Sequence, residues 1–101
     1  MPMSGFAVRA DSAGVLWLTG EFDIAAIDEF QATVDAVLDA HREVVLDLSE
    51  LTFLDSTGIR AFLIVAGKVG GGVVLRKPTP FVRRVLDLTG IEGRLGIRID
   101  D

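Results

Sequence analysis

Two short apolar strands on either side of a helical segment constrain the fold of this chain most. Val44–Leu46 is too short for a buried helix and is typical of a central strand, and Val73–Arg76 is a second short strand. Between them, from Ser56 or Thr57 to about Val69, apolar side chains recur at helical spacing. A strand, a helix and a second strand in this order predict a βαβ unit whose strands pair in parallel.

The chain before this unit predicts a hairpin and a first helix. Residues 6–10 and 15–19 have the composition of two strands, and residues 11–14 form the turn between them. Over residues 24–40, apolar side chains recur at helical spacing, with acidic side chains on the opposite face. Residues 49–55 predict a loop that leads into the second helix.

The chain after the unit predicts a third helix and an edge strand. Thr79 is a good N-cap, Pro80 suits the first helical position, and Gly90 follows the last turn. Residues 97–99 predict a short edge strand. Together these elements predict an α/β fold over residues 1–101. It is a single domain with a mixed sheet of four or five strands, an N-terminal hairpin and helices packed on the sheet.

The composition excludes several classes of function. The chain has 101 residues and no cysteine, which rules out disulfides, thiolate nucleophiles and zinc sites built on cysteine. Its net charge of −5 disfavours nucleic acid as a partner. No apolar run approaches the ~20 residues of a membrane span, and the chain does not begin like a signal peptide. We therefore expect no membrane insertion and a cytoplasmic location.

The sequence contains no motif for a cofactor or a metal. Gly70–Gly72 lacks the Lys-Ser/Thr ending of a phosphate-binding loop and precedes a strand instead of a helix. Asp47 and Asp55 have no histidine or cysteine at ligand spacing, and Asp47 is interpreted as structural. The single histidine, His41, is expected at the end of the first helix, near its terminal carbonyls.

The most informative segment is Leu54–Gly58, which admits two interpretations. In the first, Asp55 or Ser56 only caps the second helix. In the second, Ser56 is presented to another protein at the helix start, where free N–H groups and the helix dipole tolerate a phosphate. A serine hydrolase is not supported, because Leu54 stands where a nucleophile elbow needs glycine and His41 completes no triad.

Two loops are predicted at the same edge of the sheet. Functional groups of parallel sheets tend to lie outside the carboxyl ends of the strands. The segments 20–23 and 49–56 both follow strands. We therefore expect Asp23 to lie on the same rim as Asp55 and Ser56.

The second helix is apolar on most of its circumference. Such a helix is either deeply buried or in contact with another chain, and a second copy of this protein is one such chain. One apolar face is formed by Ile59, Phe62, Leu63 and Ala66. The apolar surface is extended around the helix by Ile64, Val65 and Val69.

Four segments resemble a known family in their order and spacing. They are Gly20–Asp23, Val45–Ser49, Phe53–Ile59 and Val82–Ile91. Together they resemble the STAS domain of bacterial anti-anti-sigma factors, also called anti-sigma factor antagonists, over about residues 15–91. The resemblance implies a small mixed sheet backed by helices, in agreement with the fold predicted above.

The resemblance also implies a binding function and no enzymatic activity. In this family the unmodified protein binds an anti-sigma factor, a serine kinase of the histidine-kinase-like ATPase type, and thereby releases a sigma factor for transcription. The kinase phosphorylates a serine that corresponds to Ser56, with Thr57 as the second candidate, and a metal-dependent serine/threonine phosphatase reverses the modification. The implied partner-binding positions are Asp23, Asp55, Ser56, Thr57, Gly58 and Ile59.

A second function remains open for a domain of this kind. Some STAS domains are permanent accessory subunits of a lipid-transport ATPase or of a stress-sensing scaffold complex. The apolar second helix would suit such a constitutive contact. A receiver domain fits less well, because the rim offers the single acid Asp23 after the first strand and Lys77 is poorly placed.

Overall fold

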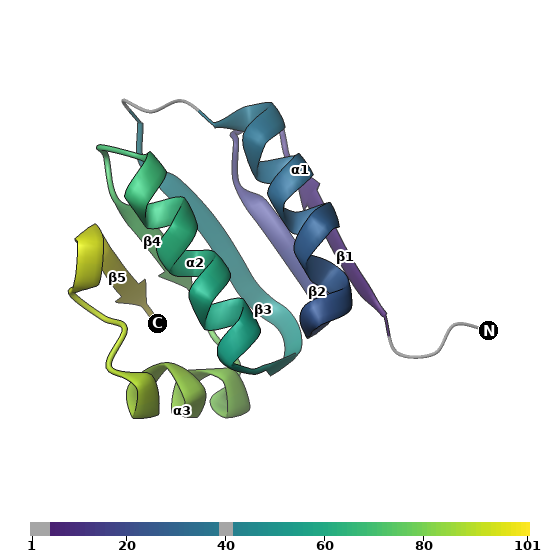
Figure 1. Ribbon diagram of the computed structural model, residues 1–101, viewed down its shortest axis with the longest axis vertical. Coiled ribbons are helices and arrows are strands. Elements are labelled where there is room, and N and C mark those ends of the chain that lie inside the picture. Colours follow the sequence, from purple (N-terminus) through teal and green to yellow (C-terminus); the bar gives the residue numbers. More distant parts are fainter. Residues whose placement is uncertain (1–4, 39–41) are drawn as a thin grey trace.

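The computed structural model describes residues 5–38 and 42–101, which form one five-stranded sheet with helices packed on it (Figure 1). The strands are β1 (Phe6–Ala10), β2 (Leu16–Phe22), β3 (Val44–Leu54), β4 (Val73–Arg76) and β5 (Ile97–Asp100). The α-helices are α1 (Ile27–Val37), α2 (Ser56–Lys68) and α3 (Pro80–Thr89), and the 3₁₀ turns are η1 (Ile24–Ala26) and η2 (Arg94–Gly96).

The strands lie in the sheet in their order along the chain. β1 pairs with β2 in antiparallel orientation, whereas β2, β3, β4 and β5 pair in parallel. The predicted hairpin, βαβ unit and edge strand are confirmed, and the sheet has the larger of the two expected strand numbers.

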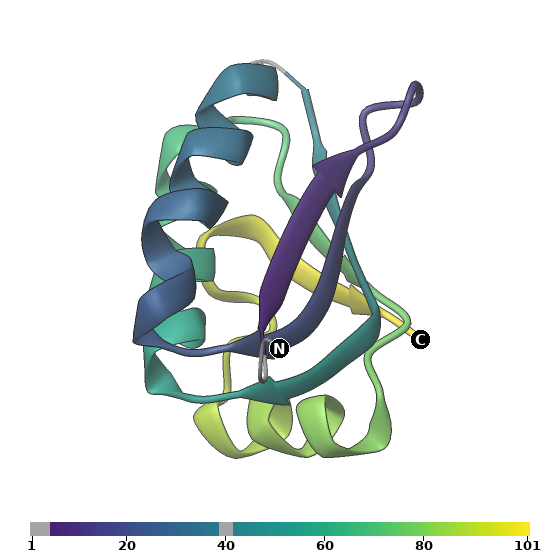
Figure 2. The same cartoon turned by 90° about the vertical axis from the view of Figure 1, so that its right-hand side faces the viewer.

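The helices cover one face and one end of the sheet. Figure 2 shows α1 and α2 on the same face, and α3 across the edge at which β3 ends. Over the described ranges, the opposite face carries no helix (Figure 2). The hydroxyl of Thr79 accepts a hydrogen bond from the N–H of Val82 and donates one to the carbonyl oxygen of Leu51, so the predicted cap also ties α3 to β3.

A cluster of phenylalanines fixes α1 and α2 against the end of β2. The ring of Phe22 lies 5.0 Å from that of Phe30 and 5.7 Å from that of Phe62, between ring centres. All three side chains are fully buried, and their edge-to-face contacts add to the energy of burial. Because Phe22 is the last residue of β2, this cluster lies next to the turn that follows β2.

Burial explains most of the apolar surface of α2. Its buried residues include Ile59, Phe62, Val65 and Ala66. Ile64 is the exception, because 44% of its surface is exposed. The helix is therefore a core element with one exposed apolar position.

The prediction of a loop over residues 49–55 is wrong. β3 continues to Leu54, and residues 19–22 at the end of β2 pair with residues 50–54. Irregular register between these strands replaces simple alternation of buried and exposed side chains, so Leu48, Leu51 and Leu54 are buried at intervals of three. Alternation is the usual sequence signal of a strand, and its loss made this segment look like a loop.

The first predicted helix is shorter than expected. It starts with the 3₁₀ turn η1, and α1 ends at Val37. Residues 39–41, and with them the expected place of His41, lie outside the described residues.

Asp47 is structural, as predicted. It is 1% exposed, and its carboxylate accepts hydrogen bonds from the Ser49 hydroxyl at 2.6 Å and from Arg76 Nε at 2.8 Å. Burial alone would raise the pKa of Asp47, but the hydrogen bonds from Ser49 and Arg76 lower it below its ordinary value. Trp17 lies beside Asp47 in the register, on the face opposite the helices.

Candidate functional site

The ends of two neighbouring parallel strands form the candidate site. Phe22 at the end of β2 is the register partner of Leu54 at the end of β3. Asp23 and Asp55 follow directly, so they lie at the same edge of the sheet, as the sequence predicted. Ser56 is the next residue and begins α2.

The two turns that follow these strands have the same local geometry. The backbone angles (φ, ψ) are −123° and −169° at Asp23, and −124° and −168° at Asp55. Each carboxylate accepts a hydrogen bond from the N–H two residues later, from Ala25 at 3.0 Å and from Thr57 at 2.9 Å. Both aspartates are therefore N-caps. The interpretation that Asp55 caps the second helix is confirmed.

The hydroxyl of Ser56 is available to another protein. The Ser56 side chain is exposed, and no hydrogen bond to another described residue involves its oxygen. Thr57, the second candidate, is half-buried. Because Asp55 already acts as the cap, the Ser56 hydroxyl has no role in stabilising the helix start.

Three amide groups at the start of α2, those of the residues after Ser56, are already occupied. The N–H of Thr57 donates to the Asp55 carboxylate, and those of Gly58 and Ile59 donate to the Asp55 carbonyl oxygen at 3.1 and 3.2 Å. The expectation that free N–H groups would face a phosphate on Ser56 therefore applies only to the N–H of Ser56 itself, which has no acceptor among the described residues.

Of the six partner-binding positions that the resemblance implies, Gly58 and Ile59 are the two that are buried. A Cβ atom on Gly58 would lie 2.2 Å from Leu54 Cδ1 and 3.2 Å from Phe22 Cγ. Gly58 thus permits close contact between α2 and the strand ends. Both residues position the turn that carries Ser56 and contribute little or no surface to a partner.

The charges around Ser56 are mostly negative. Asp55 precedes it, Asp23 caps the neighbouring turn, and Asp28 and Glu29 lie in the first turn of α1. Arg60 lies four residues after Ser56 on the same side of α2, is exposed, and forms no ion pair with a described residue. The sequence reading missed Arg60, although its spacing from Ser56 was visible.

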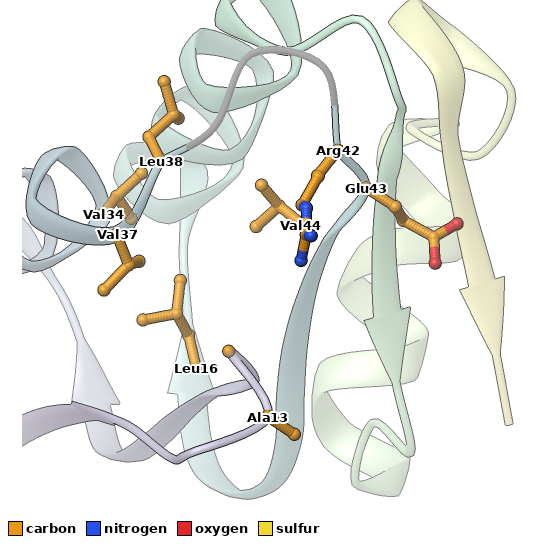
Figure 3. A pocket seen from close by; sticks show the side chains of 9 residues that line it. Ala13, Leu16, Val34, Val37, Leu38, Arg42, Glu43 and Val44 are labelled. Atoms are coloured by element: carbon orange, nitrogen blue, oxygen red, sulfur yellow. The ribbon is translucent and has the colours of Figure 1, made fainter.

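An apolar groove of about 430 Å³ lies next to this rim, between η1, α1 and α2. Thr57 lines it, together with Ile24, Ile27 and Ile64. A smaller hollow of about 110 Å³ lies where β3 begins, at the opposite end of the strand from Ser56 (Figure 3). Of these two, the larger groove is the one that adjoins the candidate site.

A third hollow, of about 130 Å³, is acidic. Glu21, Asp23 and Glu29 line it. Within the part of the chain that the structure covers, no group of three or more histidine, aspartate or glutamate side chains is arranged to hold a metal ion. Among the same residues, no helix has the length and apolar character needed to cross a membrane.

Comparison with known proteins identifies the family. The family model described as "Mlab, STAS domain" matches residues 6–98. The chain belongs to the STAS family. The fold agrees with this assignment, because the single mixed sheet with an N-terminal hairpin corresponds to that of other STAS domains.

Two relatives are similar to this chain in sequence. One is BtrV of Bordetella bronchiseptica, provisionally named an anti-sigma factor antagonist, which is 34% identical over 81% of this chain and 74% of its own length. The other is a STAS-domain containing protein of Pseudomonas aeruginosa, 30% identical over 74% of this chain and 77% of its own length.

Two solved structures share the fold. An anti-sigma factor antagonist from Mycobacterium paratuberculosis superposes with a TM-score of 0.73 at 28% identity, covering 95% of this chain and 86% of that one. The anti-sigma factor antagonist SpoIIAA in its unphosphorylated form superposes with a TM-score of 0.69 at 19% identity, covering 96% and 89%. The latter similarity concerns the fold alone.

Proposed function

We propose that this STAS domain is an anti-sigma factor antagonist that is switched off by phosphorylation of Ser56. Its partner is an anti-sigma factor that is also a serine kinase of the histidine-kinase-like ATPase type. Binding of the unmodified domain to this partner releases a sigma factor in the cytoplasm. The names of BtrV and of the Mycobacterium paratuberculosis protein support the antagonist function.

The single observation that carries the proposal is the position of the Ser56 hydroxyl. It is exposed, forms no hydrogen bond to the described residues and directly follows the capping Asp55, at the edge of the sheet that also carries the capping Asp23. In the unmodified state, a partner meets a neutral hydroxyl here. Asp23, Asp55 and Thr57 offer further contacts around it, and the buried Gly58 and Ile59 hold the turn in place.

A phosphate would change this surface without changing the fold. It adds a charge of about −1.5 to −2 at neutral pH. Because the N–H groups of Thr57, Gly58 and Ile59 are already bonded, this charge would remain at the surface, at the edge that also carries Asp23 and Asp55. A poorly paired charge at an interface costs several kcal/mol, which corresponds to a hundredfold or greater loss of affinity.

The chemistry belongs to the partners and not to this domain. The kinase transfers the γ-phosphoryl group of ATP to Ser56 Oγ, ADP leaves, and a base on the kinase takes the hydroxyl proton. A metal-dependent serine/threonine phosphatase hydrolyses the phosphoserine and restores the hydroxyl. This domain supplies the acceptor side chain and the docking surface.

The proposal is tested by phosphorylation in vitro. Each histidine-kinase-like ATPase of the source organism is purified and incubated with this protein and ATP, and the modified residue is located by mass spectrometry. We expect one such kinase to modify Ser56. Modification of Thr57 alone would move the site by one residue, and the absence of modification by every kinase would overturn the proposal.

A constitutive accessory subunit is the second candidate, and the exposed apolar groove favours it. A permanent partner, such as a transport ATPase or a stress-sensing scaffold, would cover this groove at all times. Binding to such a partner would not respond to phosphate on Ser56. A complex that persists unchanged after quantitative phosphorylation would therefore support this function and exclude the switch.

A further inference from the structure

The two edges of the sheet differ in how their outward backbone groups are occupied. The edge strands are β1 and β5. On β5, the outward carbonyl oxygen of Ile97 accepts a hydrogen bond from the N–H of Gly93 at 2.7 Å. The outward N–H of Ile99 donates to the Glu92 carboxylate at 3.2 Å. The chain itself thus hinders the addition of another strand at β5.

The outward backbone groups of β1 have no such partners. Just after β1, the N–H of Asp11 donates to the carbonyl oxygen of Val15 at 2.9 Å. Hydrogen-bonded pairs alternate along an antiparallel ladder, so the odd-numbered residues of this strand bond to β2. The N–H and C=O groups of Phe6, Val8 and Ala10 therefore point away from the sheet, and none of them bonds to a described residue.

The one charged side chain of β1 does not protect this edge. A charged side chain on an edge strand commonly discourages pairing with another strand. The guanidinium carbon of Arg9, however, lies 5.2 Å from the centre of the Trp17 ring on β2. The cation–π contact holds the charge over the neighbouring strand, away from the outer edge. Figure 2 views the sheet from this side, and no described helix or strand lies in front of β1.

The edge of β1 is complementary to itself in one antiparallel register. When Val8 faces Val8 of a second copy, Phe6 faces Ala10, and every outward donor faces an outward acceptor. Side chains directly opposite each other in such a pair are in contact. In this register the large Phe6 faces the small Ala10, and Arg9 faces Ala7. No two charges are therefore directly opposite each other.

We propose that a second copy of this chain pairs with β1 in this register, so that two sheets join into one across a two-fold axis at Val8. Both copies contribute the same surface, as in other two-fold dimers. The joint is short, because a strand of five residues extends only about 17 Å. A stable dimer buries about 800 Å² on each copy. The β1 dimer is therefore weak and forms as the protein concentration rises.

The dimer does not depend on the proposed function. β2 lies between β1 and β3, and Ser56 follows β3. The pairing uses no residue of the turn that carries Ser56. A failure of Ser56 phosphorylation would therefore leave this proposal intact, and a monomeric protein would leave the proposed function intact.

Hydrogen exchange of the native protein, followed by NMR at increasing protein concentration, tests the pairing at each residue. The N–H groups of Ala7 and Arg9 bond to β2 and should be protected at every concentration. Those of Phe6, Val8 and Ala10 should exchange quickly in dilute protein and about threefold or more slowly in concentrated protein. If exchange at these three positions does not change with concentration, the proposal is wrong, even if the protein dimerises through another surface.

A proline substitution tests the same edge by sedimentation. Ala10→Pro removes an N–H that points away from β2, so the ladder with β2 is kept. The dimer loses one hydrogen bond from each copy. Ser12→Pro is the matched control, because Ser12 is exposed and is the second residue of the turn Asp11–Gly14, where proline is favoured. Analytical ultracentrifugation measures the dimer dissociation constant of both variants and of the native protein.

We expect Ala10→Pro to raise the dimer dissociation constant about tenfold or more, and Ser12→Pro to leave it nearly unchanged. An equal dissociation constant in Ala10→Pro and the native protein would overturn the proposal, as would a native protein that stays monomeric at its highest attainable concentration. Equal weakening by both prolines would assign the effect to the hairpin and contradict pairing through β1. If Ala10→Pro does not fold by circular dichroism, the hydrogen exchange of the native protein decides alone.

Discussion

The turn after β2 and the turn after β3 share one backbone geometry but present different side chains. Each begins with a capping aspartate, Asp23 or Asp55, with almost identical φ and ψ angles. The residue that follows is Ile24 in the first turn and Ser56 in the second, and both are exposed. The same local scaffold thus offers an apolar contact at one position and a hydroxyl that can be modified at the other.

The turns also differ in how the helix continues. Three residues after the aspartate, the first turn has the buried Ala26 and the second has Gly58. Gly58 lets α2 begin as an α-helix in contact with Leu54 and Phe22, whereas Ala26 lies in a 3₁₀ turn that precedes α1. Side chains, rather than different backbone caps, distinguish the two turns.

The largest expected effect tests whether Ser56 carries the switch. Ser56→Asp should reduce affinity for the kinase about a hundredfold, because it puts a permanent charge beside two carboxylates. Ser56→Ala should bind like the native protein, because Asp55 and not Ser56 caps α2. Calorimetric titration of both variants measures this difference, and equal affinities would show that the charge at this turn does not control binding.

The second effect concerns the buried acid Asp47, which does not belong to the rim and is expected to stabilise the fold. Asp47→Asn should lower the free energy of unfolding by about 2–4 kcal/mol at pH 7, because Arg76 and Ser49 lose a charged acceptor. The folded-state pKa of Asp47 lies below its ordinary 3.8, so its stabilising contribution is complete above that pH and is lost as the pH falls further.

Urea unfolding at several pH values measures this contribution. The stability difference between native protein and Asp47→Asn should be constant from neutral pH down to about pH 5 and should shrink below about pH 4. Ser56→Ala serves as the control, since it leaves Asp47 untouched. A difference that stays constant into acid would show that the Asp47 carboxylate is not what stabilises this face of the sheet.

The sequence predicted the elements better than their extent. Apolar runs and helix signals at Val44–Leu46, Thr79 and Gly90 are local and strong, and each element they predict is present. The end of β3 was missed because its pattern depends on irregular pairing with β2, which is a property of two strands together. Side-chain periodicity within one segment carries no information about such pairing.

The candidate site was predicted in part for the same reason. The order of strands and caps was enough to bring Asp23, Asp55 and Ser56 to one edge. The burial of Gly58 was not visible, because it depends on contacts with Leu54 and Phe22 from other elements. The groove beside Ser56 likewise depends on how α1 and α2 pack, and the apolar character of α2 alone left burial and partner contact equally open.

A smaller effect tests the equivalence of the two caps. Asp23→Ala and Asp55→Ala should each lower the free energy of unfolding by about 0.5–2 kcal/mol, because each loses one N–H acceptor. The two losses should be similar, since the two hydrogen bonds differ by only 0.1 Å in length, 3.0 against 2.9 Å. Asn substitutions at the same positions keep a capping oxygen and serve as controls.

Chemical denaturation of the four variants shows whether the two caps contribute equally to the free energy of unfolding. If Asp55→Ala were far more destabilising than Asp23→Ala, the second turn would depend on its cap in a way the matching geometry does not explain. If the Asn controls lost as much as the Ala variants, the negative charge and not the hydrogen bond would be the stabilising feature.

The smallest effect concerns Arg60, a basic residue that has no equivalent in the turn after β2. An anion at Ser56 and a cation four residues later face each other in the favourable orientation along α2, a pair worth about 0.5 kcal/mol. Because Arg60 has no other ion pair among the described residues, it is free to turn toward the phosphate. The pair should lower the second pKa of the phosphate, because the nearby cation favours the dianion.

Phosphoserine incorporated at position 56 during translation allows this test without the kinase. Phosphorus NMR titration should give a higher second pKa for the phosphate in Arg60→Gln than in the native sequence. Arg84→Gln, a substitution of an exposed arginine on α3, is the matched control and should leave the titration unchanged. Identical titrations in all three proteins would mean that the phosphate stays unpaired, so that its whole charge, together with Asp23 and Asp55, would oppose the partner.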